Sequence, residues 1–118
     1  MKKRILALMA GVALSAAAWA MTPASFPGGN DGYQKYIAEN LKYPQAAKDN
    51  GIEGEVGVQF TVNADGSIGN IRIKRMVDPD LEAEAIRLIK QMPKWTPASD
   101  NGTPVQSVAE LNVSFSLD

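Results

Sequence analysis

The most regular pattern in this chain lies at residues 53–62, which read EGEVGVQFTV. Valine or phenylalanine occupies every second position from Val56 to Val62, and glycine, glutamine and threonine fill the positions between them. Strict alternation of this kind places apolar side chains on one face of a strand and polar ones on the other. The run therefore predicts a half-buried β-strand.

A second strand follows after a tight turn. The turn residues are NADG at 63–66, and β-type residues resume from Ser67 to Arg75, so the two runs predict a hairpin. Ile68 is out of phase with the two isoleucines that follow it. We expect a bulge near Gly69 and Asn70 to restore the phase, because glycine inside a strand often marks one.

Two segments with helical spacing flank the hairpin. Tyr33, Ile37 and Leu41 recur every four positions and predict a helix that Tyr43-Pro44 ends. A short helical turn is expected from Gln45 to Asn50, closed by glycine. After the hairpin, Asp78 is the expected N-cap and Pro79 the first residue of a helix that runs to about Met92. The apolar stripe of this last helix consists of Leu81, Ala85, Leu88, Ile89 and Met92.

Alternation returns in the last part of the chain, from Val105 to Leu117. At about 3.3 Å per residue, a strand of this length extends roughly 40 Å, farther than the hairpin strands can cover. The predicted fold is α+β and two-layered: a three-stranded antiparallel sheet with two helices packed on one face. The third strand pairs with one hairpin strand, and its far edge stays open.

Composition limits the chemistry that this chain can support. It has 118 residues with neither cysteine nor histidine, so one domain must act without disulfides, thiolates, imidazole bases or the usual zinc ligands. Residues 1–20 are predicted to form a signal peptide that is cleaved on export: Lys2 to Arg4 give the basic start, Ile5 to Ala17 the apolar run, and Ala18-Trp19-Ala20 the cleavage site. Its retention as an inner-membrane anchor is the alternative.

Cleavage removes three of the twelve basic residues and leaves nine against thirteen acidic ones, a formal charge of about −4. Nucleic acid is therefore not an expected partner. Residues 21–32, rich in proline and glycine, are expected to form an irregular leader, and residues 33–118 the domain itself.

Three motifs offer alternatives in catalysis or ligand binding. Asp78, Asp80, Glu82 and Glu84 resemble a paired-carboxylate or metal site, but favourable charges at a helix start explain them more simply. The 63–66 turn lacks the glutamate that closes a calcium loop, and the glycines at 28 and 29 lack the lysine of a phosphate loop. We therefore expect no enzyme activity, metal, cofactor or small-molecule substrate. Phe26 and Trp95 either plug the ends of the core or mark a contact surface.

Several motifs in the same order resemble the TonB C-terminal domain family. They are Phe26-Pro27-Gly28-Gly29, Leu41-Lys42-Tyr43-Pro44, Gly51-Ile52-Glu53-Gly54, the alternating run 56–62, Asp65-Gly66-Ser67-Ile68, Ala85-Ile86 and Trp95-Thr96-Pro97-Ala98. The resemblance covers nearly all of the chain after residue 20. It implies a periplasmic domain, associated with TonB-dependent transport, that binds the N-terminal box of an outer-membrane receptor.

In that family the receptor segment adds as a strand beside the last strand, which agrees with the open edge expected here. By position, the resemblance makes the following residues the partner-binding set: Val105, Gln106, Ser107, Val108, Ala109, Glu110, Leu111, Asn112, Val113, Ser114 and Phe115. The sequence shows no proline-rich spacer, and cleavage would remove the anchor through which force arrives, so the resemblance to an energy transducer does not extend to a prediction of force transmission. The alternatives are a self-associating homodimer, an adaptor for another periplasmic protein, or a short anchored transducer if the signal is retained.

Overall fold

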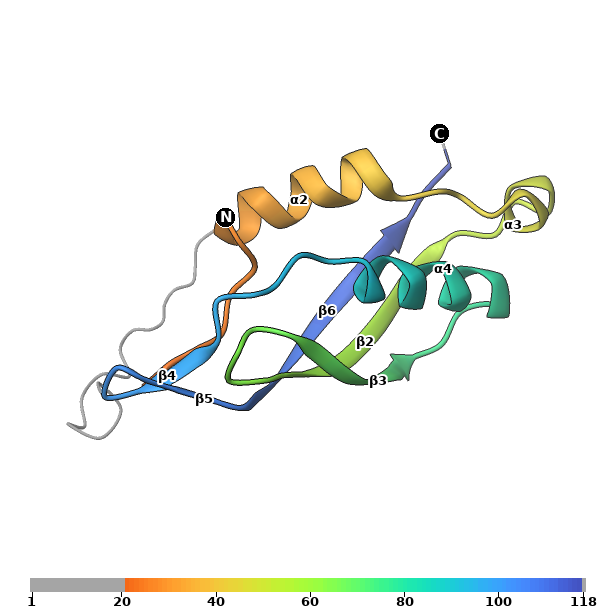
Figure 1. Cartoon of the computed structure of the whole chain (residues 1–118). Coiled ribbons are helices and arrows are strands. Elements are labelled where there is room, and N and C mark those ends of the chain that lie inside the picture. Colours follow the sequence, from red (N-terminus) through yellow and green to blue (C-terminus); the bar gives the residue numbers. More distant parts are fainter. Residues whose placement is uncertain (1–20, 118) are drawn as a thin grey trace.

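The computed structural model describes residues 21–117, which are built on a three-stranded antiparallel sheet (Figure 1). The strand order is β3-β2-β6, where β2 is Gly54–Val62, β3 is Ile68–Arg75 and β6 is Ser107–Phe115. The predicted hairpin and the pairing of a third strand are both confirmed. The predicted signal peptide, residues 1–20, lies outside the described residues.

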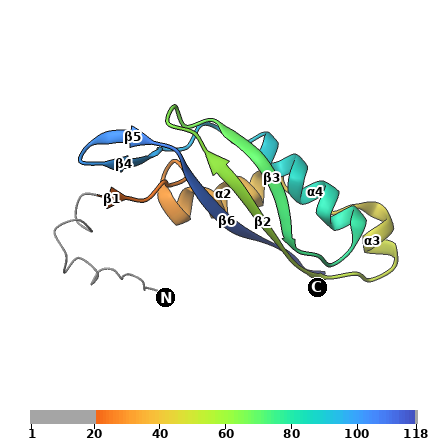
Figure 2. The same ribbon diagram turned by 90° about the horizontal axis from the view of Figure 1, so that it is seen from below.

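Two helices lie on the same face of this sheet, α2 at Gly29–Asn40 and α4 at Pro79–Lys90 (Figure 2). A short helix, α3 at Gln45–Asp49, lies beside α4 at one end of the molecule. The α+β, two-layer prediction is therefore confirmed. As predicted, Asp78 is the N-cap of α4: its carboxylate accepts the main-chain N–H groups of Asp80 and Leu81 at 2.9 and 3.3 Å.

The core forms between β2 and α4. The alternating residues of β2 from Val56 to Val62 are at most 1% exposed, and α4 contributes Leu81, Leu88 and Ile89, which are fully buried. Burial of each such side chain contributes roughly 1.5–3 kcal/mol, which makes this face the main source of stability.

The predicted bulge in β3 is present. Between the pairs Gln59 with Arg72 and Thr61 with Gly69, β3 has one residue more than β2, and Asn70 takes a left-handed conformation with φ 48°. The bulge brings Ile68 onto the same side as the later isoleucines of β3, where it packs against the core.

A second, smaller sheet was not predicted. It has the order β1-β4-β5, from β1 at Met21–Thr22, β4 at Ala98–Asp100 and β5 at Thr103–Val105, and it extends from one end of the main sheet (Figure 2). The prediction of one continuous strand from residue 105 to 117 is wrong. Asn101 and Gly102 both have positive φ, 54° and 83°, and this turn folds β5 back onto β4. The chain then passes into the main sheet through Gln106.

The first helix starts earlier than expected. It begins at Gly29 instead of Tyr33, after a tight turn in which the Gly29 N–H donates to the Phe26 carbonyl oxygen at 2.7 Å. Gly28, in the left-handed region at φ 84°, permits this turn. Residues 21–32 thus contain a strand and the first turn of α2, although an irregular leader was expected.

Candidate functional site

One long side of β6 is the candidate site. On its other side β6 pairs with β2 along its whole length, from Phe115 with Gly54 to Ser107 with Val62. Within residues 21–117 no strand pairs with the outer side of β6. β2 and β6 end together, so the last strand does not extend beyond the hairpin strands as was expected. What remains open is the side of β6 that faces away from β2.

The pairing determines which main-chain groups face this edge. The Asn63 N–H donates to the Ser67 carbonyl oxygen at 2.8 Å in the hairpin, so Asn63 faces β3. Alternate residues of an antiparallel strand face the same neighbour, so every second residue of β2 back from Asn63 also faces β3. Their partners on β6 face the open edge, and they are Val108, Glu110, Asn112 and Ser114.

Tyr33 of α2 occupies one of these edge positions. Its hydroxyl donates to the main-chain carbonyl oxygen of Asn112 at 3.1 Å, which agrees with the outward direction derived for Asn112. The side chain is only 7% exposed. Burial, followed by the nearby charge of Glu55, raises the pKa of Tyr33 to about 12, so the hydroxyl stays protonated and remains a donor at neutral pH. The sequence pattern indicated only a core-facing aromatic at this position.

The side chains of β6 alternate between two environments. Those facing the helices are Ala109, Leu111, Val113 and Phe115, which join the core or pack against it. Those on the outer face are Val108, Glu110, Asn112 and Ser114, all exposed. Val108 is an apolar exception there, at 61% exposure.

The predicted partner-binding set divides between two sheets. Residues from Ser107 to Phe115 come together on β6 as expected. Val105 instead pairs with Ala98 in the small sheet, and Gln106 belongs to neither strand. These two residues do not belong to the β6 edge.

A hollow of about 190 Å³ opens next to Leu111. Besides Leu111 it is lined by Ser25, Phe26, Gly29, Asn30, Tyr33 and Trp95. Phe26 and Trp95 are both buried, and their rings meet edge to face at 6.0 Å. The two aromatics therefore plug the core, which is the first of the two alternatives predicted for them. They also line part of the hollow.

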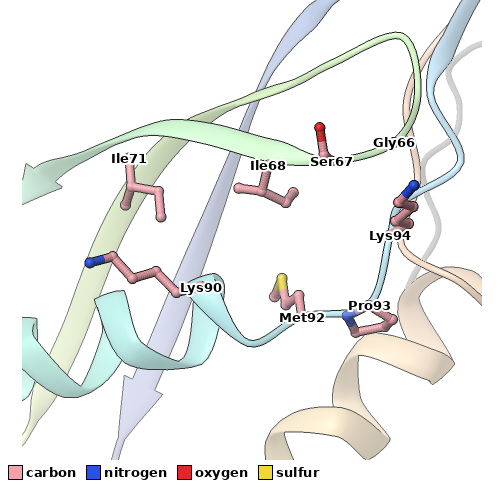
Figure 3. A pocket seen from close by; sticks show the side chains of 8 residues that line it. All are labelled: Gly66, Ser67, Ile68, Ile71, Lys90, Met92, Pro93 and Lys94. Carbon is pink, nitrogen blue, oxygen red and sulfur yellow. The ribbon is translucent and has the colours of Figure 1, made fainter.

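A different hollow, of about 290 Å³, lies between β3 and the end of α4 (Figure 3). Ile68 and Ile71 of β3 line one side, and Lys90 and Met92 line the other. Its charged side chains are two lysines, with no carboxylate or nucleophilic thiol among the lining residues. This arrangement lacks the acid and base pair that general acid–base catalysis requires.

The acidic residues of α4 have structural partners. Glu84 accepts two hydrogen bonds from Arg87, both at 2.7 Å, and one from the Lys42 main-chain N–H at 2.6 Å. Burial is the largest influence on the Glu84 carboxyl and raises its pKa. The hydrogen bonds from Arg87 and Lys42, with their charges, outweigh it and hold the pKa below its usual value. Glu82 accepts the Val77 N–H at 2.7 Å. Glu82 and Glu84 thus accept hydrogen bonds from main-chain and arginine donors. Among the described residues, no group of acidic side chains is arranged to bind a metal ion.

Comparison with known proteins identifies the family. The model of the Gram-negative bacterial TonB protein C-terminal family matches residues 39–117. The chain belongs to this family. Proteins TonB of Helicobacter pylori strains J99 and 26695 are 40% and 43% identical to it over 57% and 48% of this chain. The aligned part spans only 24% and 20% of those two proteins.

Solution structures of the H. pylori TonB C-terminal domain share the fold. Two such structures, of different lengths, superpose with TM-scores of 0.56 and 0.54 at 30% identity. They cover 72% and 71% of this chain, and 77% and 88% of the solved domains are matched. None of the helices in residues 21–117 combines the length and apolar character that crossing a membrane would need.

Proposed function

We propose that this TonB C-terminal domain binds an extended segment of another protein, which adds as a strand beside β6. The observation that supports this proposal is the row of main-chain groups that face away from β2 at Val108, Glu110, Asn112 and Ser114. Strand addition takes its affinity from main-chain hydrogen bonds of this kind and needs an accessible edge.

The partner that we propose is the N-terminal segment of a TonB-dependent outer-membrane receptor, met in the periplasm. Membership of the TonB C-terminal family supports a partner of this class. An exposed edge strand is also a hazard for aggregation, so an edge that stays open is more economically explained as one that a partner uses. The domain would act in transport across the outer membrane as a binding module, without catalysis and without a cofactor.

Proline at position 110 tests the proposal directly. The Glu110 N–H faces the open edge, so Glu110→Pro removes a donor from the binding side and leaves the ladder to β2 complete. The ring also obstructs an approaching strand. We expect receptor peptides to bind at least about tenfold more weakly, equivalent to about 1.4 kcal/mol.

Glu110→Ala is the matched control, because it removes the same side chain and keeps the N–H. Amide NMR of the purified protein, titrated with N-terminal peptides of the receptors from the same cell, measures both variants. Shifts along β6 in the wild type and in Glu110→Ala, but not in a folded Glu110→Pro, are expected. Equal affinity of all three proteins would contradict strand addition.

A second copy of the chain is the alternative occupant of the same edge. The exposed apolar side chain of Val108 on β6 favours this candidate, because a two-fold axis beside this residue would bring the Val108 side chains of two antiparallel copies together. Analytical ultracentrifugation over a wide concentration range separates the two functions. Dimerisation that Glu110→Pro abolishes, with no response to receptor peptides, would favour self-association.

A further inference from the structure

We propose that the hollow beside Leu111 receives one uncharged, apolar side chain of the added segment, and that this contact sets the register of the segment on β6. The proposal rests on the proposed function and adds to it a requirement on the sequence of the partner. Main-chain pairing alone favours no particular register, because the same donors and acceptors repeat along the edge.

A strand added beside β6 would point one of its side chains into the hollow. A residue of an added strand that lies beside Leu111 points its side chain to the same face of the sheet as Leu111, toward the helices. Because Leu111 itself lines the hollow, the neighbouring side chain enters it. In an antiparallel arrangement this is a non-hydrogen-bonded position, where opposite side chains approach most closely. A parallel segment places its side chain on the same face.

The lining determines what kind of side chain fits. The rings of Phe26 and Tyr33 meet at 6.0 Å and 73°, and Phe26 meets Trp95 at the same distance, so aromatic carbon forms much of the wall. The remaining lining residues are small or uncharged, and none of them carries a charge. A charged side chain would lose its hydration there without gaining a partner. A leucine, isoleucine or methionine side chain gains from the burial.

Tyr33 marks the end of the segment that can pair without displacing the domain's own contacts. Its hydroxyl already occupies the Asn112 carbonyl oxygen, whereas Val108 and Glu110 remain open to a partner. A segment that pairs with Val108 and Glu110 places its next residue beside Leu111, at the hollow. Tyr33 therefore both lines the hollow and marks the end of the open edge.

The test uses the receptor peptide that gives the largest shifts in the NMR titration. Each residue of that peptide is replaced in turn by alanine. We expect one apolar position to dominate, with a loss of about tenfold or more in affinity, since a buried leucine truncated to alanine loses about three methylene equivalents. Intermolecular NOEs from that side chain should reach Leu111 and the Trp95 ring.

A change on the protein side completes the test. Leu111→Ala enlarges the hollow and should reverse the preference between peptides that carry leucine and phenylalanine at the dominant position. Val108→Ala is the matched control, because it truncates the same strand on its outer face and should leave that preference unchanged. Tyr33→Phe keeps the ring in the wall of the hollow and frees the Asn112 carbonyl oxygen, and it should not tighten binding, because the segment ends before Asn112.

Four results would overturn the proposal. Binding with shifts at Val108 and Glu110, but with no single dominant apolar position, would refute the hollow alone and leave strand addition standing. An unaltered peptide preference in Leu111→Ala would do the same. Tighter binding by Tyr33→Phe would show that the segment competes for the Asn112 carbonyl oxygen, and would refute the register. Absence of binding by every receptor peptide would refute the proposed function together with the hollow.

Discussion

Replacement of Tyr33 by phenylalanine should change stability in opposite directions at neutral and alkaline pH. The substitution keeps the buried ring and removes only the hydroxyl that donates to the Asn112 carbonyl oxygen at 3.1 Å. One such hydrogen bond contributes about 1 kcal/mol, and the carbonyl lies at a sheet edge, where water can replace the lost donor. Near pH 7 the variant should therefore unfold with a free energy lower by about 1 kcal/mol or less.

The alkaline effect follows from the raised pKa. In the folded protein the pKa of Tyr33 lies at about 12, above the ordinary value of 10.0. The folded state therefore binds the phenolic proton more tightly. The stability that this provides is complete below pH 10 and is lost as pH rises through the folded value. The full difference corresponds to roughly 2–3 kcal/mol, and about half of it should be lost by pH 11.

Urea unfolding of the two proteins at several pH values between 8 and 11 measures this directly. The difference between wild type and variant removes the contributions of other titrating groups, including Tyr36 and Tyr43. We expect the wild type to be more stable at pH 8 and its advantage to disappear or reverse at pH 11. A difference that stays constant over this range would refute the burial and hydrogen bonding assigned to the Tyr33 hydroxyl.

Three further substitutions test contacts elsewhere in the fold. Asp78→Ala removes the N-cap of α4 and should lower the free energy of unfolding by about 1 kcal/mol, whereas Asp78→Asn should retain most of it; chemical denaturation distinguishes them. Arg87→Met deprives the buried Glu84 carboxylate of its main partner and should cost about 2 kcal/mol at pH 7, less than a fully buried pair because Arg87 is partly exposed. Arg87 and Lys42 lower the pKa of Glu84 in the folded protein. Their contribution to folding stability is therefore present above the pKa of the unfolded state and is lost as the pH falls through the folded-state value. The difference in unfolding free energy between wild type and Arg87→Met should therefore narrow as the pH is lowered. A difference that widens would contradict the interaction assigned to Glu84 and Arg87. The Ser107 hydroxyl is buried with no hydrogen-bond partner within residues 21–117, so Ser107→Ala should be neutral or stabilising by about 1 kcal/mol in thermal melts, and a clear loss would reveal a missing partner.

Local signals account for the parts of the fold that the sequence predicted correctly. The β2–β3 hairpin follows from alternation and turn residues, and α4 from its N-cap at Asp78 and apolar stripe. The bulge near Asn70 was also predictable, because the phase of the isoleucines required an extra residue. Each of these features depends on neighbours that are close in the chain.

Features that depend on distant partners were not predictable in this way. The break at Gln106 lies within an alternating run, and only the pairing of Thr103–Val105 with Ala98–Asp100 shows that the chain changes sheets. The contact of Tyr33 with Asn112 joins residues that are 79 positions apart. The helical spacing placed Tyr33 on a buried face, but it carried no information about which main-chain group its hydroxyl meets.

The outward direction of the main-chain groups on β6 has a consequence for mutational drift. Donors and acceptors of the backbone persist through almost any substitution, so Glu110, Asn112 and Ser114 are free to vary without erasing the edge, with proline as the exception. Their side chains carry little of the folding energy, because all three are exposed. A lineage can therefore change the charge of this surface, and with it the partners that it attracts, while the fold beneath stays the same.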